Sequence, residues 1–182
     1  MPEIAKLGLK LFLLAAVAGL ALGITNEVTK GPIEKQKIAA SNAARIAVLP
    51  EGKDFEPIVG ITDKVDELFT AKDENGNVVG HTGMIKVQGF GGPIEVTVGV
   101  NNEGTVTGIS VGGSDFQETA GLGAKTKDAE FTDRFKGIDA KTANIAVAAD
   151  GGVIEAVTGA TISSRAVSNG VKTVADAILA LN

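Results

Sequence analysis

Cysteine, tyrosine and tryptophan are absent from this chain, and histidine occurs once, at His81. Without cysteine there is no disulfide, no thiolate metal site and no cysteine-bound iron–sulfur cluster. A single histidine also speaks against a histidine-based metal site, and we interpret His81 as an ordinary strand or loop residue. Any redox chemistry therefore requires a bound organic cofactor, or a metal held by nitrogen and oxygen ligands.

Length and charge limit the class of protein further. The chain has 182 residues and a net charge of −5. This length leaves room for one membrane segment and one domain large enough to bury its own core. The first 25 residues carry Glu3 against Lys6 and Lys10, so the remainder is more acidic than the whole chain. An acidic domain has no electrostatic attraction to a phosphate backbone, and nucleic acid is not an expected partner.

One long apolar run occupies residues 7–25, and its only charge is Lys10. As a helix this run would span about 28 Å, close to the thickness of the hydrocarbon core of a bilayer. We therefore predict a transmembrane helix at 7–25, after a short segment at 1–6. A cleaved signal peptide is the alternative, because the residues before the run are few and weakly basic. Lysines on both sides of the run leave its orientation undecided from charge alone.

A second helix is predicted at residues 33–48, where apolar residues recur at helical spacing and Pro50 ends the pattern. This helix either prolongs the first one or is separated from it by a bend at Gly31-Pro32. We assign residues 26–56 to a connecting helical segment and residues 57–182 to the domain that follows.

From Glu67 onward the hydrophobic period changes to two, which predicts β-strands. Strands at 68–71 and 78–87 are joined across residues 73–77, whose Asn75-Gly76 pair is a strong hairpin signal. Strands at 94–100 and 105–111 form a second antiparallel hairpin. The predicted fold class is therefore α+β, with an N-terminal transmembrane helix followed by one domain of antiparallel β-hairpins and a C-terminal helix.

The rest of the domain is predicted to alternate loops with short elements. A loop at 112–127, rich in glycine and polar residues, suits ligand binding. A short helix at 128–135 places Phe131 and Phe135 on one face, where we expect them to join the core. Apolar runs at 144–149 and 153–157 predict two more strands. The predicted buried face of the closing helix consists of Ile162, Ala166, Val167, Val171, Val174, Ile178 and Leu181.

Residues 158–165, with the sequence TGATISSR, lead into that closing helix and place Thr161 at or next to its N-terminus. The first amides of a helix have no partner inside the helix, and the macrodipole adds partial positive charge, so an anion is favoured there. Gly159 and Ala160 leave room for a bulky group, and Gly159 can take a positive φ. A phosphoester on Thr161 would suit this position. The alternative is an ordinary N-cap, in which Thr158, Thr161 or Ser163 satisfies the free amides.

Two segments together resemble the FMN-binding domains of the Rnf and sodium-pumping NADH:quinone oxidoreductase complexes. Thr-Gly-Ala-Thr at 158–161 is similar to the S/T-G-A-T flavinylation motif of that family. Glu-Thr-Ala-Gly-Leu-Gly-Ala-Lys at 118–125 is similar to its E-T-x-G-L-G-x-K signature, although the family more often has proline where Ala120 stands. The segments occur in the family's order, and the resemblance, which is to the G subunit of the Rnf complex, covers nearly the whole chain.

The resemblance implies a covalently bound FMN and a set of residues around it. Thr161 would be the acceptor, joined to the phosphate of FMN by a flavin transferase that uses FAD. Lys125 would place positive charge near N1 of the ring or near a phosphate oxygen. Arg165, one turn beyond Thr161, would pair with phosphate or with a carboxylate such as Glu155. The remaining predicted contacts are Glu118, Thr119, Leu122 and Gly123, which would shape the flavin pocket, together with Thr158, Gly159, Ala160 and Ser163.

The same resemblance implies a role and a place in the cell. The chain would be an electron-relay subunit, without a complete active site of its own, of a complex that couples electron flow between ferredoxin and NAD to ion translocation. It would cross the cell membrane once, with a cytoplasmic N-terminus and the FMN domain on the outer face. Its partners would be the other Rnf subunits, the flavin transferase and membrane lipid.

Two other functions remain compatible with the sequence. The first is a membrane-anchored flavinylated protein that serves extracellular electron transfer outside any ion pump. The second is a non-redox surface or assembly module, in which residues 158–164 form only a helix cap.

Overall fold

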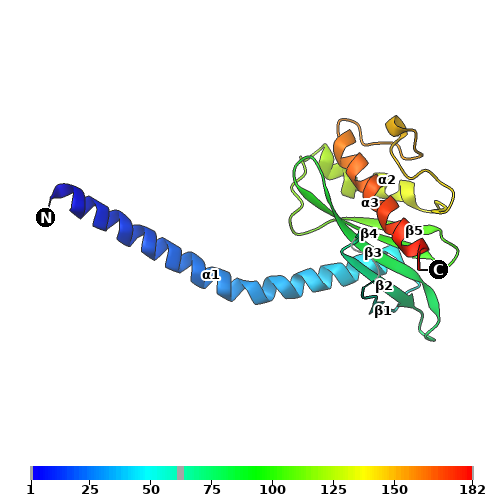
Figure 1. Ribbon diagram of the computed structural model, residues 1–182, viewed down its shortest axis with the longest axis horizontal. Helices are drawn as coiled ribbons and strands as arrows, with labels where there is room; N and C mark the ends of the chain where they lie inside the picture. The colour runs from blue at the N-terminus through cyan, green and yellow to red at the C-terminus, as the bar shows by residue number, and fades with distance from the viewer. Residues whose placement is uncertain (1, 61–63, 182) are drawn as a thin grey trace. The chain divides into compact units, whose positions relative to one another are not determined.

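The computed structural model describes residues 2–60 and 64–181. It divides into two compact units, Met1–Ser41 and Asn42–Asn182. The first unit is helical and the second contains the β-sheet and the remaining helices (Figure 1). The predicted domain limit at residue 57 stays a prediction.

Helix α1 (Glu3–Val48) makes up the first unit and ends inside the second. Its most apolar 18 residues have a mean hydropathy of 2.2 and are not buried, so this part is long and apolar enough to cross a membrane. The helix continues through Pro32, which makes the two predicted helices one. An internal proline costs about 3 kcal/mol in a helix, because it removes one backbone hydrogen bond and its ring crowds the preceding turn.

The second unit is built on a five-stranded antiparallel sheet whose strands follow the order of the chain. Both predicted hairpins are confirmed. In the first, the Asp73 carboxylate accepts hydrogen bonds from the amides of Asn75 and Asn77, each 2.8 Å long, and Gly76 has the positive φ, +82°, that the turn needs. The strands are β1 (Asp54–Pro57), β2 (Glu67–Lys72), β3 (Val78–Gln88), β4 (Pro93–Asn101) and β5 (Val106–Gly112).

Strand β1 differs from the prediction, because residues 54–56 fall in the stretch assigned to a helical connection. Its four residues, Asp-Phe-Glu-Pro, pair with β2 through backbone hydrogen bonds, and none of them is buried. An exposed edge strand of this length shows no apolar alternation, so the sequence pattern gives no signal for it.

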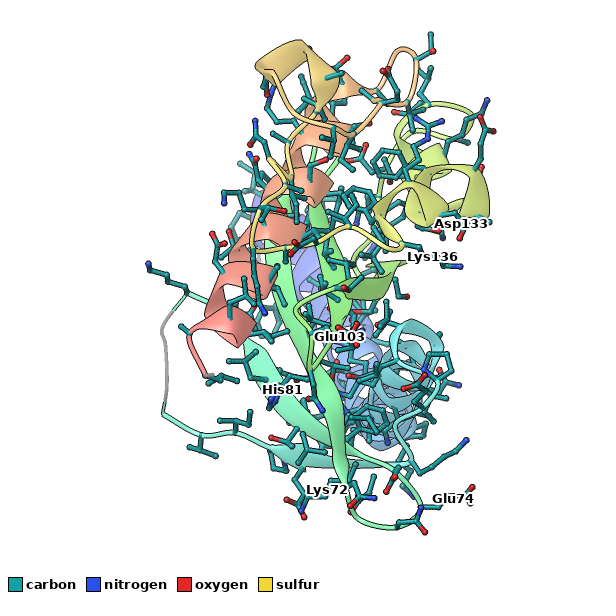
Figure 2. The ribbon with its side chains drawn as sticks, turned by 90° about the vertical axis from the view of Figure 1, so that its right-hand side faces the viewer. Lys72, Glu74, His81, Glu103, Asp133 and Lys136 are labelled. Carbon is teal, nitrogen blue, oxygen red and sulfur yellow. The ribbon has the colours of Figure 1, made fainter. Side chains whose placement is uncertain are left out.

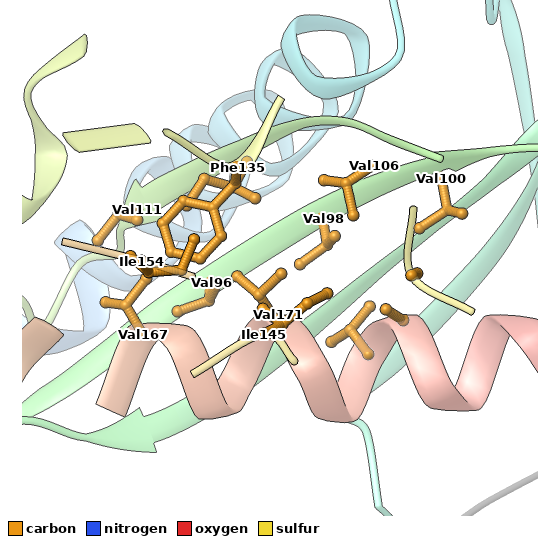
Figure 3. Packing of buried hydrophobic residues seen from close by; sticks show 14 of the residues in the cluster. Val96, Val98, Val100, Val106, Val111, Phe135, Ile145, Ile154, Val167 and Val171 are labelled. Carbon is orange, nitrogen blue, oxygen red and sulfur yellow. The ribbon is translucent and has the colours of Figure 1, made fainter. Parts of the chain in front are cut away.

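Helix α3 (Thr161–Leu179) covers one face of the sheet, and the hydrophobic core lies between them (Figure 3). Val167, Val171, Val174 and Ile178 are buried as predicted. The prediction was wrong for Ile162, which is 52% exposed. At about 100° per residue, Ile162 points about 140° away from Val167 around the helix axis. Ser163 and Ser164 take the inward positions of the first turn, and Ala166 and Leu181 are only half-buried.

The direction of α3 over the sheet fixes which ends meet. A Cβ added at Gly83 would lie 2.6 Å from Val174, and one added at Gly170 would lie 3.0 Å from Val87. Strand β3 and helix α3 therefore run in opposite directions. The first turn of α3 lies toward the C-terminal end of β3, where the chain turns into β4.

The other face of the sheet holds the last two turns of α1, residues 42–48. Arg45 is buried there, 3.6 Å above the centroid of the Phe69 ring, and its guanidinium pairs with Glu67 at 2.6 Å. Gly99 permits close approach, because an added Cβ would lie 2.4 Å from the carbonyl oxygen of Val48. The end of α1 is therefore packed into the domain.

Beyond β5 the chain forms 3₁₀ turns and short helices: η1 (Gly123–Lys127), α2 (Ala129–Thr132), η2 (Asp133–Phe135) and η3 (Ala148–Asp150). The predicted pairing of Phe131 with Phe135 is confirmed, since both are buried with ring centroids 5.4 Å apart. The strands predicted at 144–149 and 153–157 were wrong. These segments share one isolated bridge, between Val147 and Ile154, because the chain turns through η3 and then through Gly151 at φ +78°. Their apolar side chains enter the core from loops.

Candidate functional site

Helix α3 begins without a side-chain cap. Its N-cap residue is Ala160, and the preceding Gly159 has φ +77°. The first turn closes with a hydrogen bond from the Ser164 amide to the Ala160 carbonyl, 2.9 Å long. Within the part of the chain that the structure describes, the amides of Thr161, Ile162 and Ser163 donate no hydrogen bond. A side-chain N-cap therefore does not satisfy the first amides of α3. These unpaired amides are the donors from which a bound anion would accept hydrogen bonds.

The hydroxyls of this first turn divide into used and free ones. Ser163 is 1% exposed and donates to Glu118 Oε2 at 2.8 Å. Ser164 is fully buried and accepts a hydrogen bond from the Val157 amide at 3.0 Å. Thr161 is exposed, and its hydroxyl has no partner among the described residues. Of the hydroxyls at 161, 163 and 164, only that of Thr161 is therefore available to a reagent from solvent.

Glu118 connects three segments of the chain. One oxygen of its carboxylate binds Ser163, and the other accepts a 3.0 Å hydrogen bond from the amide of Gly91, in the turn between β3 and β4. A Cβ added at Gly123 would lie 2.0 Å from Glu118 Oε2, so a side chain at this position would displace the Glu118 carboxylate. Through these two hydrogen bonds Glu118, in the loop after β5, links the β3–β4 turn to the start of α3.

The predicted loop at 118–125 folds back on itself and reaches the acceptor segment. The Thr119 carbonyl accepts hydrogen bonds from the amides of Leu122 and Ala124, at 3.1 and 3.0 Å. Leu122 remains 44% exposed, and a Cβ added at Gly159 would lie 3.0 Å from its Cδ2. The loop at 118–125 and the acceptor segment at 158–165 therefore meet at two points, Glu118 with Ser163 and Leu122 with Gly159.

Basic side chains lie near this junction in different situations. Lys125 is exposed on η1, and its ammonium forms no ion pair with the described residues. Arg165 does not pair with Glu155, as the sequence suggested, because Asp150 takes both of its hydrogen bonds, at 2.5 and 2.9 Å. These bonds from the guanidinium hold the pKa of the Asp150 carboxyl below its ordinary value. The charge of Arg165 is therefore already matched within the protein.

Sequence reasoning missed two contributors to this region. One is the turn Gly89-Phe90-Gly91-Gly92, whose signal was three glycines around an aromatic residue at a predicted strand end. The other is Asp150, whose contact with Arg165 spans 15 positions and has no local pattern.

Among the described residues, no three or more His, Asp or Glu side chains form a group that could hold a metal ion. His81 lies on β3, as expected for a structural residue (Figure 2). Its Nδ1 is 3.4 Å from the Thr70 hydroxyl, and burial lowers its pKa. His81 is therefore a packed, neutral side chain on the sheet.

Comparison with known proteins identifies the family to which this chain is similar. Residues 89–176 match the FMN-binding domain family. The G subunit of the Na⁺-translocating ferredoxin:NAD⁺ oxidoreductase complex of Acetobacterium woodii is 38% identical, over 91% of this chain and 87% of the relative. The G subunit of the ion-translocating oxidoreductase complex of Methanosarcina acetivorans is 31% identical, over 98% of this chain and 96% of the relative. The crystal structure of Shewanella oneidensis NqrC gives a TM-score of 0.47 at 20% identity, covering 75% of this chain and 74% of that one.

Both sequence motifs lie inside the matched domain, and the apolar part of α1 lies outside it. The resemblance inferred from the sequence is therefore confirmed over almost the full length of the relatives, the apolar helix included. The chain belongs to the G-subunit family of ion-translocating oxidoreductase complexes, and it combines an N-terminal helix long and apolar enough to cross a membrane with an FMN-binding domain.

Proposed function

We propose that this chain is the flavin-bearing electron relay of an ion-translocating ferredoxin:NAD⁺ oxidoreductase complex, with FMN joined by a phosphoester to Thr161. One observation carries the assignment of the acceptor: among the described residues, Thr161 has the one unused hydroxyl in a helix turn whose first amides are also unused. FMN supplies the redox chemistry, and the protein supplies attachment, orientation and electrostatics.

The attachment step balances with FAD as the donor. The Thr161 oxygen attacks the phosphorus on the FMN side of the pyrophosphate, an O–P bond forms, AMP leaves with the bridging oxygen, and the hydroxyl proton is released. Ser163 is excluded from this role because its hydroxyl is buried and held by Glu118. The exposed Thr161 hydroxyl is therefore the better acceptor on grounds of access.

The same turn stabilises the product. A phosphodiester carries one negative charge, and the amides and dipole of a helix N-terminus favour such a charge by about 0.3–1 kcal/mol at an exposed site. Lys125 is exposed on η1, which packs against α3, and adds positive charge on this side of the domain. Arg165 contributes less, because Asp150 already neutralises it.

A covalent link has a physical advantage for a domain outside the cytoplasm. A reversibly bound cofactor is lost by mass action where its free concentration is low, whereas an ester bond retains it. We therefore place the N-terminus in the cytoplasm, one crossing at residues 7–25 and the FMN domain on the outer face of the cell membrane. The partners in this proposal are the other subunits of the complex, the flavin transferase and membrane lipid.

The test compares intact masses and in-gel flavin fluorescence of the full chain made with and without the transferase. The wild type should gain the mass of one FMN less one water, and its fluorescence should survive SDS. Thr161→Val keeps the shape of the side chain but lacks the hydroxyl, so it should gain no mass. Ser163→Ala should gain the full mass. Flavin retained by Thr161→Val would overturn the assignment, and purification as a lone functional flavoprotein would overturn membership of a complex.

A further inference from the structure

The aromatic side chains of this protein are few, which makes their positions informative. The chain has seven phenylalanines and no other aromatic residue besides His81. Phe131 and Phe135 fill the core, and Phe69 lies under Arg45. Phe55 packs beside Gly52, and Lys127 covers Phe116 at 4.7 Å from the ring centroid. Phe12 belongs to the apolar part of α1.

Phe90 remains, and it is 71% exposed on a turn that is itself firmly held. The amide of Gly89 donates to the Gly92 carbonyl at 2.9 Å, which closes the turn around Phe90. A Cβ added at Gly89 would lie 2.2 Å from Glu118 Oε1, and one added at Gly91 would lie 2.2 Å from the Gln117 carbonyl oxygen. The backbone on both sides of Phe90 is therefore pressed against residues 117–118. A fixed backbone presents the aromatic ring to the outside.

This turn lies toward the end of the sheet where α3 begins. Because β3 and α3 run in opposite directions, with Val87 against Gly170, the residues after β3 continue toward the first turn of α3. Glu118 makes the connection directly, with one oxygen on the Gly91 amide and the other on the Ser163 hydroxyl. A single carboxylate thus joins Gly91, which follows Phe90, to Ser163, two residues after Thr161. Two exposed aliphatic side chains belong to these segments: Leu122, whose Cδ2 lies beside Gly159, and Ile162, which follows Thr161 in the first turn of α3.

We propose that Phe90 is the aromatic contact of the isoalloxazine ring, with Leu122 and Ile162 as its aliphatic neighbours. The inference rests on the proposed flavinylation of Thr161. A flat, largely apolar ring system tethered at the start of α3 gains by covering an exposed phenylalanine, since aromatic rings prefer to stack against one another. No tyrosine or tryptophan is present to do so elsewhere. A partner protein docking on Phe90 is the competing occupant.

The test uses the flavinylated full chain in detergent and begins with Phe90→Trp. A tryptophan in contact with a flavin quenches its fluorescence by electron transfer, so the emission per bound flavin should fall several-fold. Val78→Trp is the matched control, because Val78 is also exposed but starts β3, at the opposite end of that strand from the Phe90 turn. Its emission should equal that of the wild type. Equal emission from both tryptophan variants would overturn the inference.

A second variant keeps the outcome clear if tryptophan disturbs the turn. Phe90→Ala should retain the full mass of attached FMN while iodide quenches the flavin more strongly, because one face of the ring becomes accessible. Unchanged iodide quenching together with loss of copurifying subunits would identify Phe90 as a protein contact and overturn the inference. Absence of FMN mass from the wild type would instead refute the flavinylation of Thr161, so the two failures are distinguishable.

Discussion

The Glu118 carboxylate and the Ser163 hydroxyl are 2.8 Å apart, although 45 positions separate them in the chain. This hydrogen bond joins the loop after β5 to the first turn of α3. The other carboxylate oxygen holds the Gly91 amide, so the geometry around Thr161 depends on Glu118. A residue far from Thr161 in the sequence therefore positions the acceptor turn.

Replacement of Glu118 should weaken the domain and disturb the acceptor turn. Glu118→Ala removes both acceptors and leaves the buried Ser163 hydroxyl without its partner, which costs about 1–3 kcal/mol in unfolding free energy. Glu118→Gln should lose much less, because its side-chain amide oxygen can still accept a hydrogen bond from Gly91, and its NH₂ group can donate one to Ser163. Urea unfolding of both variants measures the difference. Equal losses would show that the negative charge of Glu118, and not its hydrogen bonds, stabilises the junction.

A side chain should destabilise the domain at Gly123 but not at Gly112. The added methyl group of Gly123→Ala would lie 2.0 Å from Glu118 Oε2, so the carboxylate has to leave its partners. We expect a loss of about 1–3 kcal/mol, as for other overpacked sites. Gly112→Ala is the control, because an added Cβ there meets nothing within 4 Å and its φ is not positive. Thermal unfolding should separate the two variants, and coinciding midpoints would contradict the crowding at Gly123.

The sequence predicted those parts of the fold that have local causes. Asn75-Gly76 and the alternation of Ile94, Val96, Val98 and Val100 determine the hairpins within a few residues of chain, and the helical period after Thr161 predicts α3. Even the conformation of Gly159, at φ +77°, was foreseeable from its place before a helix. These features depend on neighbouring residues only.

The predictions that were wrong concern features that depend on tertiary contacts. The apolar run around Val147 has the composition of a strand, yet it lies in a loop because the core accepts its side chains from there. In the first turn of α3, Ser163 faces inward and Ile162 does not. The rotation of the whole helix about its axis, set by its packing on the sheet, decides this. The partner of Arg165 is Asp150, and no pattern of spacing gives such a contact.

The end of α1 and strand β1 should be indispensable to the domain. A chain of residues 42–182 should unfold cooperatively, whereas residues 57–182 should be strongly destabilised. The shorter chain lacks Arg45, which pairs with Glu67, the buried side chains of Val48 and Leu49, and three of the four residues of β1. Burial of each aliphatic side chain contributes about 1.5–3 kcal/mol. Circular dichroism during urea unfolding measures the difference, and equal midpoints would place the start of the folding unit at 57, as the sequence pattern indicated.

The pH dependence of stability should contain a contribution from His81. Burial lowers its folded-state pKa below the ordinary value of 6.5, so in the unfolded chain the imidazole binds a proton that the folded chain does not. Stability should therefore fall as the pH decreases below about 6.5, and this fall should end once the pH passes the folded-state pKa. Above 6.5 both states are neutral at this residue, and the contribution disappears.

The variant that isolates this contribution is His81→Gln, which keeps a polar side chain beside Thr70 but does not titrate. In residues 42–182, its unfolding free energy should be nearly independent of pH between 5 and 7, where that of the wild type declines on acidification. Asp73, Asp139 and Asp150 have lowered pKa values, so their contributions are lost only at more acidic pH, below 3.8. Both proteins should therefore share the same loss of stability in that range. A decline between pH 7 and 5 that persists in His81→Gln would assign the effect to another group.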